Sequence, residues 1–81
     1  MKIARSHRFL KNFSDLPKPI RKKLNKQLER LIADIRYPSL RAKKFDEPRG
    51  IWQARVDDHF RFYFQIDGDT YIRVNVLPHS D

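Results

Sequence analysis

The chain of 81 residues has no cysteine and only two glycines. Without cysteine, neither a disulfide framework nor a thiolate zinc site is possible, and a reducing compartment is permitted. No segment approaches the roughly 20 apolar residues that span a bilayer, and the N-terminal sequence MKIARSHRFL lacks the apolar run of a signal peptide. We therefore expect a cytoplasmic protein that does not enter a membrane. At this length, residues 1–81 are expected to form a single domain without a separate cofactor-binding lobe.

Acidic residues are scarce in the first half of the chain. Residues 1–44 hold fourteen Lys and Arg and three acids, a net charge of +11, whereas residues 45–81 hold four and seven, a net charge of −3. A polycation of this kind is expected to bind a polyanion. Charge alone leaves nucleic acid, the ribosome, an acidic protein and an anionic membrane open as partners.

Two segments of the first half have apolar residues at helical spacing. Ser6 is expected to cap a short helix that ends near Pro17, after a short strand at residues 1–4. Residues 17–38 predict a longer amphipathic helix that begins and ends at prolines. Its basic residues lie largely off the apolar stripe, and they are Arg21, Lys22, Lys23, Lys26 and Arg30. This basic face is either a binding surface or an ordinary solvated surface.

After Gly50 the hydrophobic period changes to two, which is typical of half-buried strands. The alternation predicts three strands joined by turns at residues 57–59 and 67–69, and residues 39–50 are expected to be a connecting loop. The apolar residues of all three strands are even-numbered, so each turn is expected to have an odd number of residues and the even-numbered face to pack on the helices. We predict an α+β fold in which an N-terminal helical hairpin packs on a small, curved, mainly antiparallel sheet of three to four strands.

The first turn places Arg55 opposite Arg61 on the polar face of the sheet. Directly opposed like charges repel, so this arrangement predicts an anion-binding site at the pair. Tyr63 and Arg73 are expected on the same face, and so is His79 if the last strand extends that far. The alternative is an ordinary exposed face on which long amphipathic side chains cover apolar surface.

The sequence IWQARVDDHFRFYFQIDGDTYIRVNVLPH, from Ile51 onward, resembles the RelE/ParE superfamily of type II toxins. The similarity lies in a strand that ends in Arg, a polar hairpin, an aromatic-Arg pair, a DG turn and a last strand that ends in a basic residue. The expected order of elements is also similar along essentially the whole chain. For RelE-like members, the resemblance implies that a ribose 2′-hydroxyl of mRNA attacks the adjacent phosphate, often at the ribosome. This reaction requires no metal or other cofactor.

The resemblance implies catalytic roles for Arg61, Arg55 and His79. Arg61 matches the family arginine that follows the aromatic residue, and it would stabilise the phosphate as charge develops. Arg55 matches a position that is commonly basic, and it would bind the same or a neighbouring phosphate. His79 matches a terminal Arg or His, and histidine is the residue type whose ordinary pKa, about 6.5, suits proton transfer near neutrality.

Further RNA contacts are expected from the sheet, from the loop before it and from the longer helix. The residues are Tyr63, Arg73, Lys43, Lys44, Lys22, Lys23, Lys26 and Arg30. We interpret Trp52 as a core residue and His59 as a turn residue, and Tyr71 is a weaker candidate for contact with RNA. RelE-like nucleases often have lysine where this chain has Gln53, and many have a later tyrosine that has no counterpart before Asp81. These departures imply either that cleavage is weaker or that His79 alone carries out the proton transfers.

A type II toxin is expected to bind a cognate antitoxin, and a RelE-like toxin is also expected to bind mRNA and the ribosome. Two alternatives stay open. The first is a ParE-like protein that binds DNA gyrase and has no chemistry of its own. The second is a basic nucleic-acid-binding module that keeps the fold without the activity.

Overall fold

The computed structural model describes residues 2–78, which form five strands, two α-helices and a short 3-10 helix. In chain order the elements are β1 (Lys2–Arg5), α1 (His7–Ser14), α2 (Lys18–Ala33), η1 (Pro38–Leu40), β2 (Lys43–Asp46), β3 (Ile51–Arg55), β4 (Phe60–Asp67) and β5 (Thr70–Pro78). The predicted α+β class is confirmed, and so are the short first strand and the presence of two helices before the main part of the sheet.

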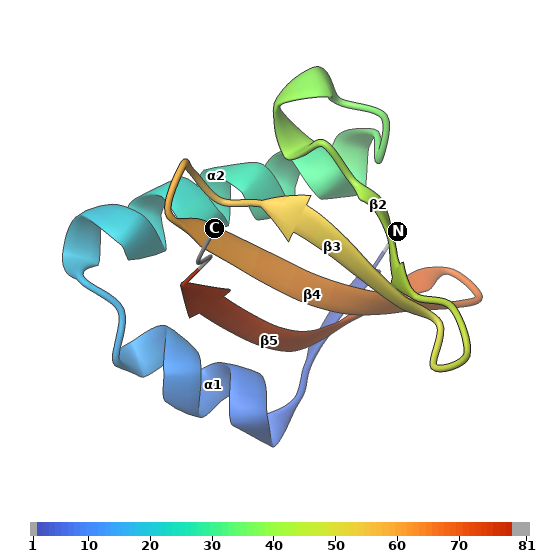
Figure 1. Cartoon of the computed structure of the whole chain (residues 1–81), viewed down its shortest axis with the longest axis horizontal. Coiled ribbons are helices and arrows are strands. Elements are labelled where there is room, and N and C mark those ends of the chain that lie inside the picture. Colours follow the sequence, from blue (N-terminus) through green and yellow to red (C-terminus); the bar gives the residue numbers. More distant parts are fainter. Residues whose placement is uncertain (1, 79–81) are drawn as a thin grey trace.

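The strands within residues 2–78 form one mixed sheet with the order β1-β5-β4-β3-β2 (Figure 1). β1 is parallel to β5, and the other neighbours are antiparallel. The prediction of three to four strands is wrong, because residues 43–46 of the expected loop pair with β3 as the edge strand β2. Lys43, Lys44 and Phe45 are all exposed, so β2 lacks the half-buried alternation by which strands are found in a sequence.

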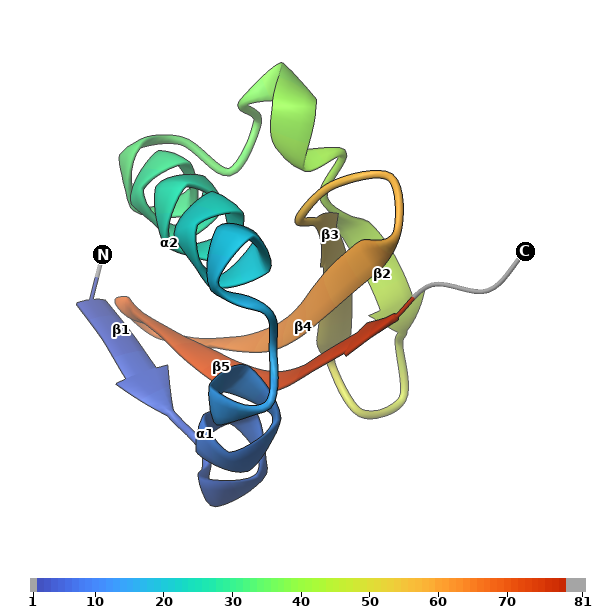
Figure 2. The same cartoon turned by 90° about the vertical axis from the view of Figure 1, so that its left-hand side faces the viewer.

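The N-terminus of α1 is fixed by Ser6, as predicted. The Ser6 Oγ accepts a hydrogen bond from the backbone N–H of Phe9 at 3.1 Å, which satisfies a free amide of the first helical turn. The same hydroxyl donates to the backbone O of Val74 at 3.0 Å. These bonds attach α1 to β5 beyond the end of β1, so the helix runs beside that strand (Figure 2).

The longer helix, α2, starts directly after Pro17 and is shorter than the predicted segment 17–38. It ends at Ala33 because the next residue, Asp34, has an extended backbone, and Pro38 starts the separate 3-10 turn. α2 lies over one face of the sheet, whereas α1 runs along the β5 edge of the sheet (Figures 1 and 2). No helix within the described residues is long and apolar enough to cross a membrane.

The core lies between the helices and the even-numbered face of β3 and β4. Phe62 and Phe64 of β4 are fully buried, and α2 contributes Leu24, Leu28 and Leu31. Burial of a side chain of this size stabilises the fold by about 1.5–3 kcal/mol. The prediction that the even-numbered residues of β3 and β4 face the helices is confirmed by the burial of Ala54, Phe62 and Phe64, whereas Ile66 near the end of β4 is exposed.

The turn between β4 and β5 is shorter than predicted. Asp67 pairs with Thr70, so the turn has two residues, Gly68 and Asp69, instead of three. Gly68 has the expected positive φ, +58°. A turn with an even number of residues pairs even-numbered with odd-numbered positions, which contradicts the predicted register next to the turn.

A β-bulge restores the predicted register farther along the same hairpin. Phe64 pairs with Arg73, whereas its neighbour Tyr63 pairs with Asn75, so Val74 is an extra residue of β5. Between the turn and the bulge, β5 therefore presents its odd-numbered residues to the core.

This change of face corrects two predictions for β5. Tyr71 is buried in the core and Ile72 is not, although the alternation assigned Ile72 to the core. Arg73 shares the face of Phe64, and its guanidinium lies 4.8 Å from the ring centroid of Phe9. The prediction that Arg73 belongs to the same cationic face as Arg55 is wrong.

Candidate nucleic-acid interface

The turn between β3 and β4 has the predicted register. Arg55 pairs with Arg61 across the two strands, and the backbone N of Val56 donates to the backbone O of Phe60 at 3.0 Å. The predicted turn at residues 57–59 is confirmed by this bond. The two arginines therefore project from directly opposed positions, as the odd-numbered turn requires.

Asp57 fixes the conformation of this turn. Its Oδ1 accepts hydrogen bonds from the backbone N–H groups of His59 at 2.8 Å and Phe60 at 2.9 Å. Its Oδ2 lies 3.4 Å from Nζ of Lys23 on α2. Burial by itself would raise the pKa of Asp57, but the two amides and the lysine outweigh burial and hold the pKa below its usual value.

Each opposed arginine has a local partner that offsets the repulsion. Nη1 of Arg61 donates to the backbone O of Asp57 at 2.6 Å and to the backbone O of Phe60 at 3.0 Å. Nη2 of Arg55 pairs with the carboxylate of Asp58. The side chain of Asp58 is 77% exposed and that of Arg55 is 25% exposed, so the carboxylate covers the arginine from the solvent side.

A cavity of about 180 Å³ opens beside the arginine pair, and we call it the strand cavity. Its lining residues are Arg41, Lys43, Gln53, Ala54, Arg55 and Arg61. None of these lining residues is acidic, so within the described chain the cavity has a cationic wall suited to a phosphate group.

The two predicted loop lysines lie on opposite faces of the sheet. Lys43 pairs with Gln53 and lines the strand cavity. Lys44 pairs with Trp52, and its Nζ lies 6.0 Å from the centroid of the indole ring. Only Lys43 therefore lies on the face of the arginine pair, because neighbouring residues of a strand point to opposite faces. The predicted RNA contact of Lys44 stays a prediction.

Arg41 is a lining residue that the sequence did not single out. It follows η1 and has φ 47° and ψ 42°, a left-handed conformation that costs a non-glycine residue about 1 kcal/mol or more. Its sequence context, in SLRAKK, contains no glycine or asparagine that would indicate a left-handed residue. The preceding Leu40 is fully buried, and this burial places Arg41 at the surface next to Arg55.

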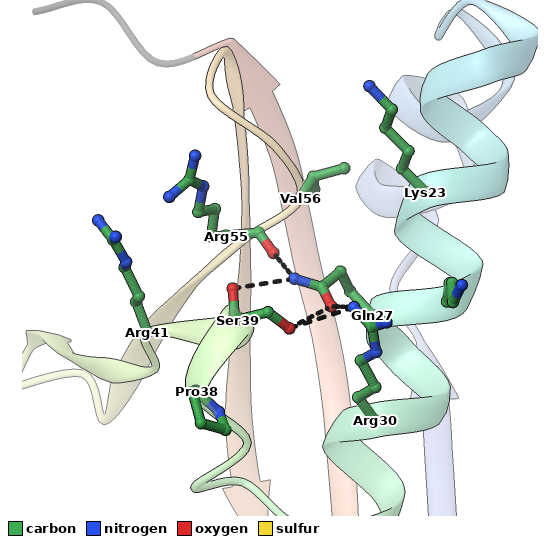
Figure 3. Close-up of a pocket in the computed structure, with 9 residues that line it drawn as sticks. Lys23, Gln27, Arg30, Pro38, Ser39, Arg41, Arg55 and Val56 are labelled. Atoms are coloured by element: carbon green, nitrogen blue, oxygen red, sulfur yellow. Dashed lines mark hydrogen bonds between the residues drawn. The ribbon is translucent and has the colours of Figure 1, made fainter.

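A second cavity, of about 410 Å³, lies between α2, η1 and the start of the β3–β4 turn, and we call it the helix cavity (Figure 3). Its lining residues are Lys23, Lys26, Gln27, Arg30, Pro38, Ser39, Arg41, Arg55 and Val56. Three of the predicted helix cations, Lys23, Lys26 and Arg30, thus share one side of α2 because their spacing is close to one and two helical turns. Lys22 is exposed on α2 and is not a lining residue.

The base of the helix cavity is a buried amide, Gln27, which is 4% exposed. Its Nε2 donates to the backbone O of Ser39 at 3.1 Å and to the backbone O of Arg55 at 2.9 Å. Its Oε1 accepts from Nη1 of Arg30 at 2.9 Å and from Oγ of Ser39 at 3.1 Å. This network connects α2, η1 and β3, as the dashed lines in Figure 3 show.

The three aromatic residues to which the sequence assigned a role lie in different environments. Tyr63 lies on the polar face, where its hydroxyl accepts a hydrogen bond from Nε2 of Gln53 at 3.0 Å and its ring lies 5.0 Å from that of Phe45. Tyr71 is a core residue, and its burial, followed by the charge of Asp34, raises its pKa, so the suggested contact with RNA is wrong. Trp52 is partly buried and stacks on Phe64 with ring centroids 6.2 Å apart, which confirms its place in the core.

His79 lies outside the described residues, so its position relative to the arginines stays a prediction. β5 is described as far as Pro78, which pairs with Phe60 at the same end of the hairpin as the turn that carries Asp57. Within residues 2–78, no three His, Asp or Glu side chains lie close enough together to hold a metal ion.

No protein-family model matches the chain, and no curated protein matches it. Solved structures do match. A YoeB/ParE toxin from Agrobacterium tumefaciens superposes with a TM-score of 0.81 at 13% identity, over 99% of this chain and 100% of that chain. YafQ from E. coli strain BL21(DE3) gives a TM-score of 0.79 at 16% identity, over 96% and 92% of the two chains.

A RelB-RelE antitoxin-toxin complex from Methanococcus jannaschii also matches, with a TM-score of 0.76 at 22% identity over 93% of this chain and 88% of that chain. These identities are low, and the agreement covers nearly the whole length of each chain. The chain therefore has the fold of the RelE, YoeB and YafQ toxins, and the resemblance to the RelE/ParE superfamily is confirmed at the level of the fold.

Proposed function

We propose that this protein is the toxin of a type II toxin-antitoxin system and that it cleaves mRNA at the ribosome without a metal ion. The opposed pair of Arg55 and Arg61 beside the strand cavity carries this proposal. Support for the toxin class comes from the fold, because the structures that share it are toxins, among them one described as a RelB-RelE antitoxin-toxin complex. A cognate antitoxin is therefore part of the proposal.

The cationic wall would bind the phosphate that is cleaved. As the ribose 2′-oxygen attacks phosphorus, negative charge builds on the non-bridging oxygens, and fixed guanidinium groups stabilise that charge. Arg61 is held by two backbone carbonyls and keeps further N–H donors for the phosphate. Arg55 is paired with the exposed Asp58, so we expect the phosphate to displace this carboxylate.

The reaction moves two protons and breaks one bond. The 2′-hydroxyl loses its proton as the new bond from O2′ to phosphorus forms, and the bond from phosphorus to O5′ breaks. The leaving O5′ then takes a proton, and the other product is a 2′,3′-cyclic phosphate. Arginine is a poor proton acceptor, so we assign at least one of these transfers to His79.

The proposal is tested by inducing the protein in growing cells and mapping transcript ends by primer extension. We expect discrete cuts within translated codons for the unaltered protein. Arg61→Ala should abolish the cuts and His79→Ala should reduce them strongly. Lys11→Gln serves as the control, because Lys11 is an exposed cation of α1 that lines neither cavity. Cuts that persist in Arg61→Ala contradict the proposed catalytic site.

One observation favours the ParE-like alternative. The described lining of the strand cavity consists of Arg, Lys, Gln and Ala, which are residue types that rarely transfer protons near neutrality. A protein that binds gyrase without chemistry needs no such group. Uncut transcripts together with double-strand DNA breaks would support this alternative over the nuclease.

A further inference from the structure

The helix cavity and the strand cavity share one wall. Arg41 and Arg55 line both of them. Figure 3 shows these two side chains extending in the same direction on one side of the helix cavity, while Lys23 extends from α2 on the other side. A polyanion bound at the arginine pair can therefore continue into the helix cavity without leaving a cationic surface.

Two cations of the helix cavity, Arg30 and Lys23, are held in place by contacts within the protein. Both N–H groups of the Gln27 amide and its oxygen are used in hydrogen bonds to η1, β3 and Arg30. Lys23 is held 3.4 Å from the Asp57 carboxylate that orders the turn. Such a site loses little conformational entropy when an anion binds, which favours a specific site over a diffuse charged surface.

The size and the lining of the helix cavity suit a nucleotide. Its volume of about 410 Å³ exceeds what a phosphate group alone occupies. The exposed Pro38 provides apolar surface for a ribose or a base, and Lys23, Lys26 and Arg41 provide charge for a phosphate. None of the described lining residues is acidic.

We propose that the helix cavity binds a second nucleotide of the same RNA strand, next to the one whose phosphate lies in the strand cavity. Arg41 then contacts the backbone at the junction, and Lys26 contacts the phosphate of the second nucleotide. This inference rests on the proposed function, because it takes single-stranded RNA as the ligand of the strand cavity. It assigns Lys26 and Arg41 to the substrate itself rather than to ribosomal RNA.

Binding of 2′-O-methyl RNA tests this inference, because these oligonucleotides lack the attacking hydroxyl and are not cleaved. We expect a five-nucleotide RNA to bind the unaltered protein more tightly than a dinucleotide. Lys26→Gln should weaken binding of the five-nucleotide RNA about five- to ten-fold and leave the dinucleotide nearly unaffected, since one charged contact is lost. The slope of log K against log salt concentration should fall by about 0.7. Lys11→Gln is the charge-matched control on α1, and it should change neither binding constant.

Arg41→Gly provides a second variant that does not depend on Lys26. Glycine adopts the left-handed backbone of residue 41 without a steric penalty, so the melting temperature should stay close to that of the unaltered protein. Loss of the shared cation should nevertheless weaken binding of both the dinucleotide and the five-nucleotide RNA. Unchanged RNA binding in a folded Arg41→Gly protein would contradict the proposal that Arg41 binds the RNA where the two cavities meet.

The failure of this inference differs from the failure of the proposed function. Loss of RNA binding in Arg61→Ala together with full binding in Lys26→Gln overturns the second-nucleotide site and leaves the nuclease intact. Full binding and cleavage in Arg61→Ala overturn the proposed function. A Lys26→Gln protein that loses affinity for poly-glutamate but keeps its affinity for RNA also overturns the inference, because the helix cavity then binds an acidic protein segment.

Discussion

The two faces of the sheet use arginine in different ways. On the polar face, Arg55 and Arg61 are held at their edges by an exposed carboxylate and by backbone carbonyls, and both border an open cavity. On the core face, the guanidinium of Arg73 lies over the ring of Phe9. A cation beside a cavity is available to a ligand, whereas a cation over a buried ring contributes to packing and stability. Residue type and position in the strand alternation do not distinguish these two roles. The bulge at Val74 reverses which residues of β5 face the core, and it therefore places Arg73 on the core face.

The largest expected effect is on the cleavage rate of a variant of the polar face. Arg61→Ala should lower the cleavage rate about 10²- to 10³-fold, the loss seen when one oriented donor to a developing anion is removed. Its free energy of unfolding should change little, because within residues 2–78 the hydrogen bonds of this side chain go to backbone carbonyls of its own turn. Single-turnover cleavage and thermal unfolding of the same protein measure both quantities. A large fall in melting temperature together with a normal cleavage rate would reverse the roles assigned to the two faces.

The corresponding change on the core face, Arg73→Ala, should lower the stability of the protein and leave its activity unchanged. Loss of the contact with Phe9 and of the packed side-chain stem should lower the free energy of unfolding by about 1–2 kcal/mol. Cleavage by the fraction that remains folded should be normal. Urea unfolding followed by fluorescence of Trp52 measures the stability. If Arg73→Ala instead abolishes cleavage in a stable protein, the guanidinium contacts the substrate, and the assignment of Arg73 to stability rather than to cleavage is wrong.

The third prediction concerns the carboxylate that holds the polar-face turn. The folded pKa of Asp57 lies below its unfolded value of about 3.9, so its stabilisation is complete above about pH 4 and is lost as pH falls through the folded pKa. Asp57→Asn should lower the free energy of unfolding at pH 7 by about 1 kcal/mol. As the pH falls below 4, the free energy of unfolding of this variant should decrease less than that of the unaltered protein. Urea unfolding between pH 2.5 and 7 provides the comparison, and parallel pH profiles for the two proteins would exclude this role.

The smallest expected effect concerns the carboxylate that covers Arg55. Asp58→Asn should raise affinity for 2′-O-methyl RNA by up to about five-fold, because an exposed ion pair of about 0.2–1 kcal/mol no longer competes with the phosphate. Asp69→Asn is the matched control: it makes the same charge change at the other end of β4, where Asp69 pairs with Lys2. Equal gains in both variants would show a general effect of net charge rather than exposure of Arg55.

Much of the fold follows from local signals that the sequence contains. The Ser6 cap, the leucine spacing of α2 and the odd-numbered turn at residues 57–59 each correspond to one physical requirement, and each was predicted correctly. The opposition of Arg55 and Arg61 follows from the same turn, so this part of the candidate site was accessible from the sequence.

The remaining features depend on tertiary context. β2 is a short charged edge strand that is stabilised by pairing with β3 rather than by burial, so no alternation marks it. The bulge in β5 is hidden because Tyr71 and Ile72 are both apolar, and the pattern suits either face. Arg41 has a left-handed conformation next to the fully buried Leu40, and no adjacent residue type indicates this conformation.

The most direct test of the cationic face is to follow the guanidinium signals of a ¹⁵N-arginine-labelled protein by NMR during titration with five-nucleotide 2′-O-methyl RNA. If the polar face binds the RNA backbone, the signals of Arg55, Arg61 and Arg41 should shift together with one binding constant, and that of Arg73 should stay in place. A shift of Arg73 without Arg61, or saturation of the RNA with the signals of Arg55 and Arg61 unmoved, would contradict the proposed interface.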